Sequence, residues 1–194
     1  WGLDRPHVVA HDFGGAVSLR SHLVHDVPYA SLLMADVVAI PPSGSPFFRL
    51  VKQHPDVLAQ VPPYIHEALV RTYIGNASHR GLREDDLAAL VAPWLGEDGQ
   101  PAFYRQIAQA DQRYTDEIAQ WYATIDIPVL VCWGADDTWI PAARASELHE
   151  AIPGSALRII DGAGHLVQED APAELTAVLL DFLRGPLSGP GPGV

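Results

Sequence analysis

The sequence predicts an α/β fold in which a parallel β-sheet carries an inserted helical cap. Three observations favour this class. Short apolar runs alternate with segments of helical spacing at both ends of the chain, a long helical stretch separates the two ends, and polar loops follow the apolar runs. Because strands that alternate with helices pair in parallel, we expect helices on both faces of the sheet.

The first part of the core is expected to span residues 1–40. The apolar run Val8–Ala10 indicates a buried strand, and Ala16–Asp26 has the spacing of a helix with one apolar face. Ser31–Ala35 is a second apolar run of strand length. Pro and Gly residues then end regular structure, which indicates the start of a second segment.

The helical cap is expected to span residues 41–125. Helical spacing is present over Pro62–Ile74, Arg83–Trp94 and Pro101–Thr124. We expect an insertion at this point of the chain to lie over the carboxyl ends of the strands, where α/β folds bind their ligands.

The second part of the core is expected to span residues 126–184. Its apolar strands are Val129–Trp133 and Ala156–Ile160, and each is followed by a polar loop. Helical spacing is present over Ala142–Ile152 and Pro172–Leu183. Strands and helices therefore alternate again after the cap, as in the first part of the core.

Composition and charge narrow the function classes. The chain has 194 residues, of which 48% are hydrophobic and 19% charged, and this favours one globular domain. A net charge of -12 without a basic patch argues against a nucleic-acid partner. Cys132 is the single cysteine, which excludes a disulfide framework.

Neither a signal peptide nor a membrane span is recognisable in the sequence, so a cytoplasmic location is expected. The Gly- and Pro-rich residues 185–194 indicate a disordered tail.

Residues 10–15, Ala-His-Asp-Phe-Gly-Gly, join the first predicted strand to its helix. A strand, a tight turn of small residues and a helix form the setting of a nucleophile elbow. The usual nucleophile there is Ser, but this chain has Asp12. A carboxylate at an elbow implies attack on an alkyl carbon, with an ester to the enzyme as the intermediate. Taken alone, Asp12 would be interpreted as a helix N-cap.

Two further polar loops follow strands. Asp136 and Asp137 come after the strand Val129–Trp133, and His165 comes after Ala156–Ile160. Together with the elbow residue, the chain order is nucleophile, acid and histidine, which is the order of α/β-hydrolases.

These motifs resemble those of capped α/β-hydrolases with an Asp nucleophile, the branch that includes epoxide hydrolases and haloalkane or haloacetate dehalogenases. The motifs are His-Asp-Phe-Gly-Gly, Trp-Gly-x-x-Asp-x-x-x-Pro and Gly-x-Gly-His-x-x-Gln-Glu-x-x-Pro, within a resemblance that runs from about Gly2 to Leu183. The resemblance implies that Asp12 is the nucleophile and His165 the base. It implies Asp137 as the acid in preference to Asp136.

The chemistry follows from these residue types. Asp12 is ionised at neutral pH and attacks without a base. His165 would then activate water against the ester, Asp137 would orient the imidazole, and the backbone N–H of Phe13 would supply one oxyanion donor. Asp36 is an alternative acid, because some dehalogenases take the acid from the end of the preceding strand, although a turn or cap role is favoured for it.

The resemblance implies a small apolar organic substrate and no metal or organic cofactor, with epoxide hydrolysis to a diol as the preferred reaction. Ring opening needs an acid, and the segment 102–106 resembles the cap segment that carries an acidic tyrosine in epoxide hydrolases, which indicates Tyr104. Aromatic core packing is an equally favoured role for Tyr104. A second tyrosine would be Tyr64 or Tyr73, although aromatic core packing is the favoured role for both.

Dehalogenation is the alternative reaction. Phe13 argues against it, since dehalogenases usually carry there a Trp that holds halide or an Arg that holds carboxylate. A halide donor could still come from another indole: Trp94, Trp121 or Trp139. Of the histidines outside the motif loops, His11 is interpreted as structural, and surface positions are expected for His22, His25, His54, His66 and His79.

The chain starts at Trp1, close to the predicted elbow strand. The α/β-hydrolases have several strands and an oxyanion donor before that strand, so we expect an N-terminally truncated form of the fold in which these strands are absent. An exposed strand edge would invite aggregation. A non-catalytic fragment or binding scaffold is therefore a further alternative, and the sequence leaves the oligomeric state open.

Overall fold

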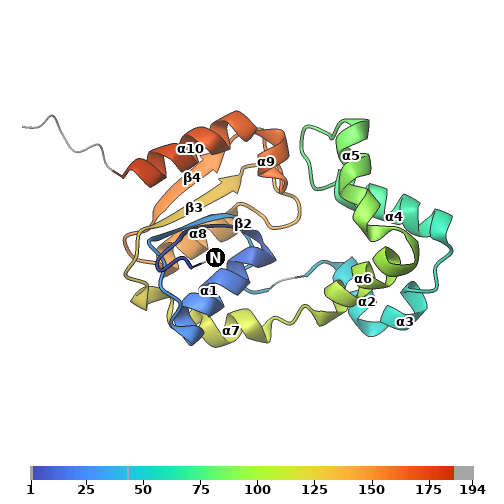
Figure 1. The fold of residues 1–194 in the computed structure, drawn as a ribbon, viewed down its shortest axis with the longest axis horizontal. Helices are drawn as coiled ribbons and strands as arrows, with labels where there is room; N and C mark the ends of the chain where they lie inside the picture. Colours follow the sequence, from blue (N-terminus) through green and yellow to red (C-terminus); the bar gives the residue numbers. More distant parts are fainter. Residues whose placement is uncertain (1, 43, 186–194) are drawn as a thin grey trace, which may run out of the picture.

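The computed structural model describes residues 2–42 and 44–185, and these contain one four-stranded parallel sheet. The strands lie in the order β1–β2–β3–β4 and span His7–Asp12, Ser31–Val37, Val129–Gly134 and Ala156–Ile160. Neighbouring strands pair in parallel throughout. The parallel sheet with its helices confirms the predicted α/β class (Figure 1).

Side chains of the central strands alternate between two apolar cores. In β2, Leu32 and Met34 belong to one core, whereas Leu33 and Ala35 belong to the other. Every residue of β2 and β3 is buried. Near-continuous apolar strands of this kind are typical of a parallel sheet that is covered on both faces.

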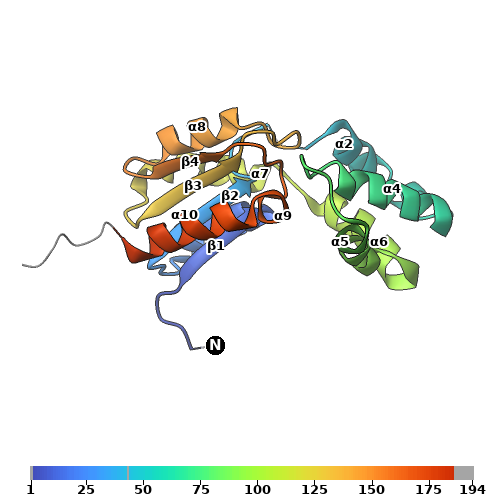
Figure 2. The same cartoon turned by 90° about the horizontal axis from the view of Figure 1, so that it is seen from above.

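Helices cover both faces of the sheet, and Figure 2 shows α8 and α10 on opposite sides of it. Helices α1, α7 and α8 pack in the core that contains Leu32, whereas α9 and α10 pack in the core that contains Leu33. These helices span Phe13–His25, Arg113–Ala119, Ala143–Ala151, Val167–Asp170 and Pro172–Arg184.

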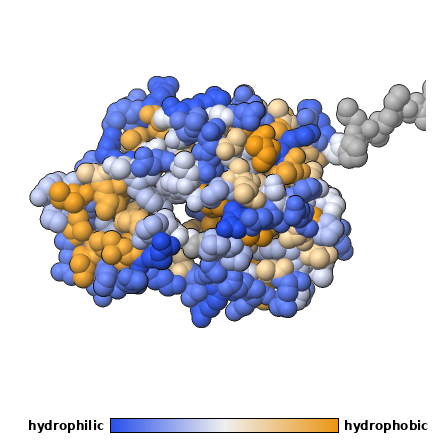
Figure 3. All heavy atoms as spheres, turned by 180° about the vertical axis from the view of Figure 1, so that it is seen from behind, coloured by the Kyte–Doolittle hydropathy of each residue, from blue (hydrophilic) through white to orange (hydrophobic). Residues whose placement is uncertain are grey.

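The inserted segment forms a separate helical lobe beside the carboxyl ends of the strands (Figure 1). Its elements are α2 (Pro46–Gln53), α3 (Pro55–Leu58), α4 (Pro63–Gly75), α5 (Glu84–Val91), the 3-10 helix η1 (Ala92–Trp94) and α6 (Gly96–Gln109). Its own apolar core contains Val51, Val70, Val91, Phe103, Tyr104 and Ile107. Figure 3 shows apolar residues gathered at the cap end of the molecule and a hollow between the two lobes.

The prediction of one long helix over Pro101–Thr124 is wrong. The segment forms the second part of α6, then α7, and then the 3-10 helix η2 (Tyr122–Thr124). Helix α6 ends where Ala110 adopts an extended conformation and the Asp111 carboxylate accepts the N–H of Arg113 at 3.1 Å. Side chains of this type compete with helical hydrogen bonding, and so a turn replaces the continuous helix.

The cap lobe is also shorter than the predicted segment 41–125. Ile118 of α7 and Tyr122 of η2 are buried in the core of the sheet lobe, where the Tyr122 hydroxyl donates to the Ala39 carbonyl at 2.8 Å. The predicted tail 185–194 lies outside the described residues, apart from Gly185. Among the described residues, no helix combines the length and apolarity needed to cross a membrane.

Gly15 in the first turn of α1 allows this helix to approach β2 closely. A Cβ atom built on Gly15 would lie 2.3 Å from the Val37 Cβ. We expect Gly15→Ala to lower the free energy of unfolding by about 1–3 kcal/mol, the usual cost of overpacking a filled core. Thermal unfolding checks this, with Gly75→Ala as the control, because nothing lies within 4 Å of that added methyl group. Equal melting temperatures for the two variants would contradict the packing argument.

Candidate active site

The carboxyl ends of the four parallel strands bring four ionisable side chains to one edge of the sheet. Asp12 ends β1, Asp36 lies near the end of β2, Asp137 follows β3 and His165 follows β4. Loops at this edge are the usual ligand-binding region of α/β folds. The structure thus gathers residues that lie far apart in the sequence.

Asp12 has the backbone geometry expected of an elbow. Its φ is 49° and its ψ is −125°, so this non-glycine residue is in a sparsely populated conformation between β1 and α1. Such strain persists only where the surrounding structure enforces it, and it concentrates at functional sites. Phe13 follows as the first residue of α1, and its backbone N–H is among the N-terminal N–H groups that have no acceptor within the helix.

His165 and Asp137 form a buried hydrogen-bonded pair. His165 Nδ1 donates to Asp137 Oδ2 at 3.0 Å, and the two side chains are 1% and 0% exposed. Asp137 Oδ1 accepts the backbone N–H groups of Trp139 and Ile140 at 2.7 and 2.9 Å. These bonds fix the carboxylate, which in turn fixes the tautomer and orientation of the imidazole.

The second imidazole nitrogen faces the elbow. His165 Nε2 lies 3.9 Å from Asp12 Oδ2 and has no hydrogen-bond partner among the described residues. Burial lowers the pKa of His165, but its interactions with Asp12 and Asp137 outweigh burial and raise that pKa to about 9. The imidazole is therefore protonated at neutral pH as long as both carboxylates are charged.

The other two aspartates differ in their surroundings. Asp136 points away from the imidazole, and its Oδ2 accepts the N–H of Gly162 at 3.1 Å. Asp36 is fully buried, with its Oδ1 accepting the N–H of Gly134 at 2.8 Å. The structure thus pairs His165 with Asp137 rather than with Asp136, and it places Asp36 next to this pair instead of in a surface turn.

A pocket of about 250 Å³ opens from Asp12 into the cap. Most of its lining side chains are aliphatic or aromatic. The polar groups come from Asp12, Gln106, Tyr73 and the two tryptophans. Its lining residues are Asp12, Phe13, Phe48, Tyr73, Ile74, Ala77, Leu90, Trp94, Phe103, Gln106, Ile107, Trp139 and Leu166. No Lys, Arg or His belongs to this lining in the part of the chain that is described.

Tyr73 of α4 is the tyrosine that lines this pocket together with Asp12. Burial and the charge of Asp12 raise the pKa of Tyr73, so its hydroxyl keeps its proton at neutral pH. The ring packs against Trp139 at a centroid distance of 4.4 Å, and Trp139 stacks on His165 at 4.9 Å. The sequence had left Tyr73 and Tyr64 as equal candidates, and Tyr64 is 73% exposed.

Tyr104, the sequence candidate for the cap acid, does not reach the pocket. It is 1% exposed in the cap core, and its hydroxyl lies 2.9 Å from His66 Nδ1. His66 is also buried, contrary to the predicted surface position, and its Nε2 lies 2.8 Å from the Trp94 carbonyl. A Tyr-His pair inside an aromatic core satisfies both side chains, so the packing alternative describes Tyr104.

The remaining candidates divide between the pocket and the surface. Trp94 and Trp139 line the pocket, whereas Trp121 is 40% exposed and lies outside it.

His11 has a positioning contact, since its Nε2 lies 2.8 Å from the His165 carbonyl. This agrees with its structural interpretation. Burial and the adjacent His165 lower the pKa of His11, which favours the neutral ring as donor to that carbonyl.

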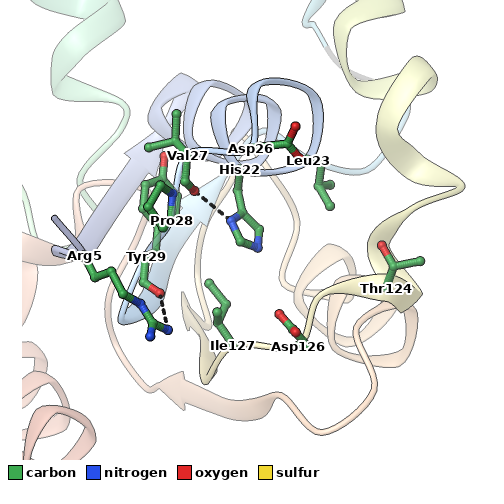
Figure 4. Close-up of a pocket in the computed structure, with 10 residues that line it drawn as sticks. All are labelled: Arg5, His22, Leu23, Asp26, Val27, Pro28, Tyr29, Thr124, Asp126 and Ile127. Atoms are coloured by element: carbon green, nitrogen blue, oxygen red, sulfur yellow. Dashed lines mark hydrogen bonds between the residues drawn. The ribbon is translucent and has the colours of Figure 1, made fainter.

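A larger pocket, of about 370 Å³, lies away from these residues. Figure 4 shows it between the end of α1 and the segments that lead into β2 and β3. It is therefore near the amino ends of the strands, and no triad residue lines it. Its lining includes Arg5, His22, Asp26, Tyr29 and Asp126. Among the described residues, no group of three or more His, Cys, Asp or Glu is arranged to hold a metal ion.

A strand-to-helix elbow, with an acid and a histidine on loops after later strands of one parallel sheet, is the arrangement of the α/β-hydrolase fold. The sequence comparison agrees. The chain belongs to the alpha/beta hydrolase family, whose sequence profile matches residues 2–178.

Three relatives illustrate the similarity. A solved alpha/beta hydrolase fold protein from Burkholderia ambifaria is 47% identical, with a TM-score of 0.90 over 93% of this chain and 67% of that one. Epoxide hydrolase A of Mycobacterium tuberculosis is 27% identical over 229 residues, covering 95% of this chain and 70% of that protein. The uncharacterized hydrolase YugF of Bacillus subtilis is 25% identical, and the chain spans 64% of its length.

Proposed function

We propose that this hydrolase opens small, neutral, apolar epoxides to diols through an ester on Asp12. The observation that carries the proposal is the position of the Asp12 carboxylate at the elbow, 3.9 Å from His165 Nε2 and in one pocket with the Tyr73 hydroxyl. Nucleophile and acid therefore line one pocket, and the base lies next to the nucleophile.

In the first step, one carboxylate oxygen of Asp12 attacks an epoxide carbon. The carbon–oxygen bond of the ring breaks, and the departing oxygen takes the proton of Tyr73 to become a hydroxyl group. The negative charge of Asp12 is consumed in this step. Because that charge contributes to the raised pKa of Tyr73, the phenol becomes a stronger acid as the ester forms.

In the second step, water cleaves the ester. Once Asp12 is esterified, it no longer holds the pKa of His165 up, so the imidazole passes its proton to the Tyr73 phenolate and becomes available as a base at neutral pH. His165 removes a proton from water, the resulting hydroxide attacks the ester carbonyl, and the Phe13 N–H stabilises the oxyanion. Collapse of the intermediate releases the diol, whose departing oxygen takes that proton from His165. The second proton of the water, left on the Asp12 carboxyl group, passes to His165 and so restores the Asp12 carboxylate and the imidazolium.

The pocket supports a neutral substrate with apolar substituents. Its aromatic lining fits an aryl or alkyl group, and no cationic side chain in the described lining offers a partner for a substrate carboxylate. This argues against haloacetate. The similarity to epoxide hydrolase A of Mycobacterium tuberculosis supports the same choice.

Haloalkane dehalogenation is a second candidate, favoured by one observation. Trp94 and Trp139 both line the pocket, and an indole N–H is a suitable donor to a departing halide. In that reaction Asp12 would form the same type of ester, halide would leave without a proton, and Tyr73 would have no acid role. The two functions therefore share their second step and differ in the first.

The test is intact-mass analysis of His165→Ala after incubation with an aryl epoxide or, separately, with a haloalkane. Without the base, the ester should form but not hydrolyse. We expect the epoxide to add its full mass to the peptide that contains Asp12. A haloalkane would add only its alkyl group.

The double variant with Asp12→Asn is the control, and it should gain no mass. An adduct from the haloalkane alone would replace the epoxide proposal with the dehalogenase. A folded His165→Ala protein that gains no mass from either compound would rule out both.

A further inference from the structure

Asp36 occupies an unusual place at the end of β2. Along the β1–β2 pair, His11 is opposite Ala35 and Asp12 is opposite Val37, so Asp36 is the extra residue of a β-bulge. Its φ is 46°, which is sparsely populated for a non-glycine residue. Bulges next to active sites re-aim side chains, and this one places the Asp36 carboxyl in the interior with no exposed surface.

Hydrogen bonding around Asp36 is incomplete if the group is ionised. Oδ1 accepts the N–H of Gly134 at 2.8 Å, but Oδ2 is buried and has no donor among the described residues. The Asp137 carboxylate is within hydrogen-bonding reach of the Asp36 carboxyl group. Two ionised carboxylates would only repel each other there, and a buried charge without a donor is costly.

Asp137 has one acceptor position left for such a contact. Its Oδ1 accepts two backbone N–H groups, and its Oδ2 accepts His165 Nδ1. An ionised carboxylate has about four acceptor positions, so the fourth is available on Oδ2. A protonated Asp36 would fill that position and at the same time satisfy its own buried oxygen.

We propose that Asp36 is a neutral carboxylic acid that donates its proton to Asp137 and so positions the carboxylate that holds His165. It is a positioning residue, because it acts through Asp137 and does not line the substrate pocket. This role rests on the proposed function of the triad, but the protonation itself can be measured without any substrate.

The surrounding charges agree with a neutral group. The titratable groups that face Asp36 from packed elements are Asp137, His165 and the Cys132 thiol of β3. Burial raises the pKa of Asp36 to about 8, with Asp137 adding to the shift and the Gly134 N–H and His165 opposing it. Below that pH Asp36 adds no negative charge beside His165.

The first experiment is infrared spectroscopy of the purified chain during a pH titration. We expect the carbonyl band of a buried carboxylic acid to persist at neutral pH, to disappear near pH 8, and to be missing in Asp36→Asn. The stability of the wild type should fall as the pH rises from about 4 to about 8, because the folded state binds a proton that the unfolded chain loses earlier. Asp36→Asn should flatten that fall.

The second experiment compares two substitutions in turnover with the substrate that labels His165→Ala. An Asn at this position can accept from Gly134 and donate to Asp137, whereas Ala can do neither. We expect Asp36→Ala to lower kcat about 10-fold with little change in KM, and Asp36→Asn to restore most of that loss. The wild type should lose activity above about pH 8, and the Asn variant should keep it.

Two results would overturn the proposal. One is the lack of an acid band that depends on Asp36. The other is an Asn variant as impaired as Asp137→Asn, because Asp36 would then be needed as a charged carboxylate. Failure of the epoxide assay alone would leave the infrared and stability results intact, so the two proposals fail separately.

Discussion

Asp12→Asn should abolish turnover, with a loss of about 10⁴-fold or more in kcat. An amide oxygen is a far weaker nucleophile than a carboxylate, and removing one member of a catalytic triad typically costs at least this much. Asn preserves the shape of the side chain and tolerates positive φ better than most residues, which matters because Asp12 has a φ of 49°. The fold should therefore survive the substitution.

The measurement is steady-state hydrolysis of an aryl epoxide, accompanied by thermal unfolding of both proteins. Glu117→Gln is a suitable control, because Glu117 forms a surface ion pair with Arg20, neither residue lines the pocket, and surface pairs contribute little. Full turnover in a folded Asp12→Asn protein would remove the covalent mechanism and leave Asp12 as a structural elbow residue.

The grouping of Asp12, Asp137 and His165 at one edge could be predicted because it follows from chain order and strand direction. Asp12, Asp137 and His165 each follow an apolar run within a few residues, and parallel strands bring such positions to one edge. The spacing of the motif Trp-Gly-x-x-Asp-x-x-x-Pro was sufficient to separate Asp137 from Asp136. No long-range packing detail was needed for these three residues.

The cap residues could not be predicted in the same way. Tyr64, Tyr73 and Tyr104 all lie on helices, and the side on which each ring lies is decided by how α4 and α6 pack against each other. His66 is buried only because Tyr104 and the Trp94 carbonyl meet it inside the cap. The sequence of α4 alone does not predict these contacts of His66.

The buried position of Asp36 could not be predicted from the sequence, for a different reason. The sequence places it at the end of a strand, but its inward direction depends on the bulge opposite Asp12. A shift of one residue in a strand reverses the face on which a side chain lies. Period-two patterns therefore cannot predict such a position, and a turn or cap role was the natural expectation.

Tyr73→Phe should lower activity and leave stability unchanged, whereas Tyr104→Phe should lower stability and leave activity nearly unchanged. Tyr73→Phe removes the proton donor of the pocket, so ring opening should slow by about 10²–10³-fold, within the usual contribution of general acid catalysis. Stability should change little, because no hydrogen bond to the Tyr73 hydroxyl is found among the described residues. Ester hydrolysis should be affected far less than ring opening, since Tyr73 gives up its proton before water attacks the ester.

Tyr104→Phe should leave epoxide turnover within about 3-fold and lower the free energy of unfolding by about 1–2 kcal/mol, because it leaves His66 Nδ1 buried without its partner. Single-turnover kinetics separates ester formation from hydrolysis, and thermal unfolding gives the stability of each variant. A large rate loss in Tyr104→Phe with none in Tyr73→Phe would mean that the cap rearranges to present Tyr104 when substrate binds. If neither variant slows the reaction while halide is released from a haloalkane, the acid is not required and dehalogenation becomes the better account of the pocket.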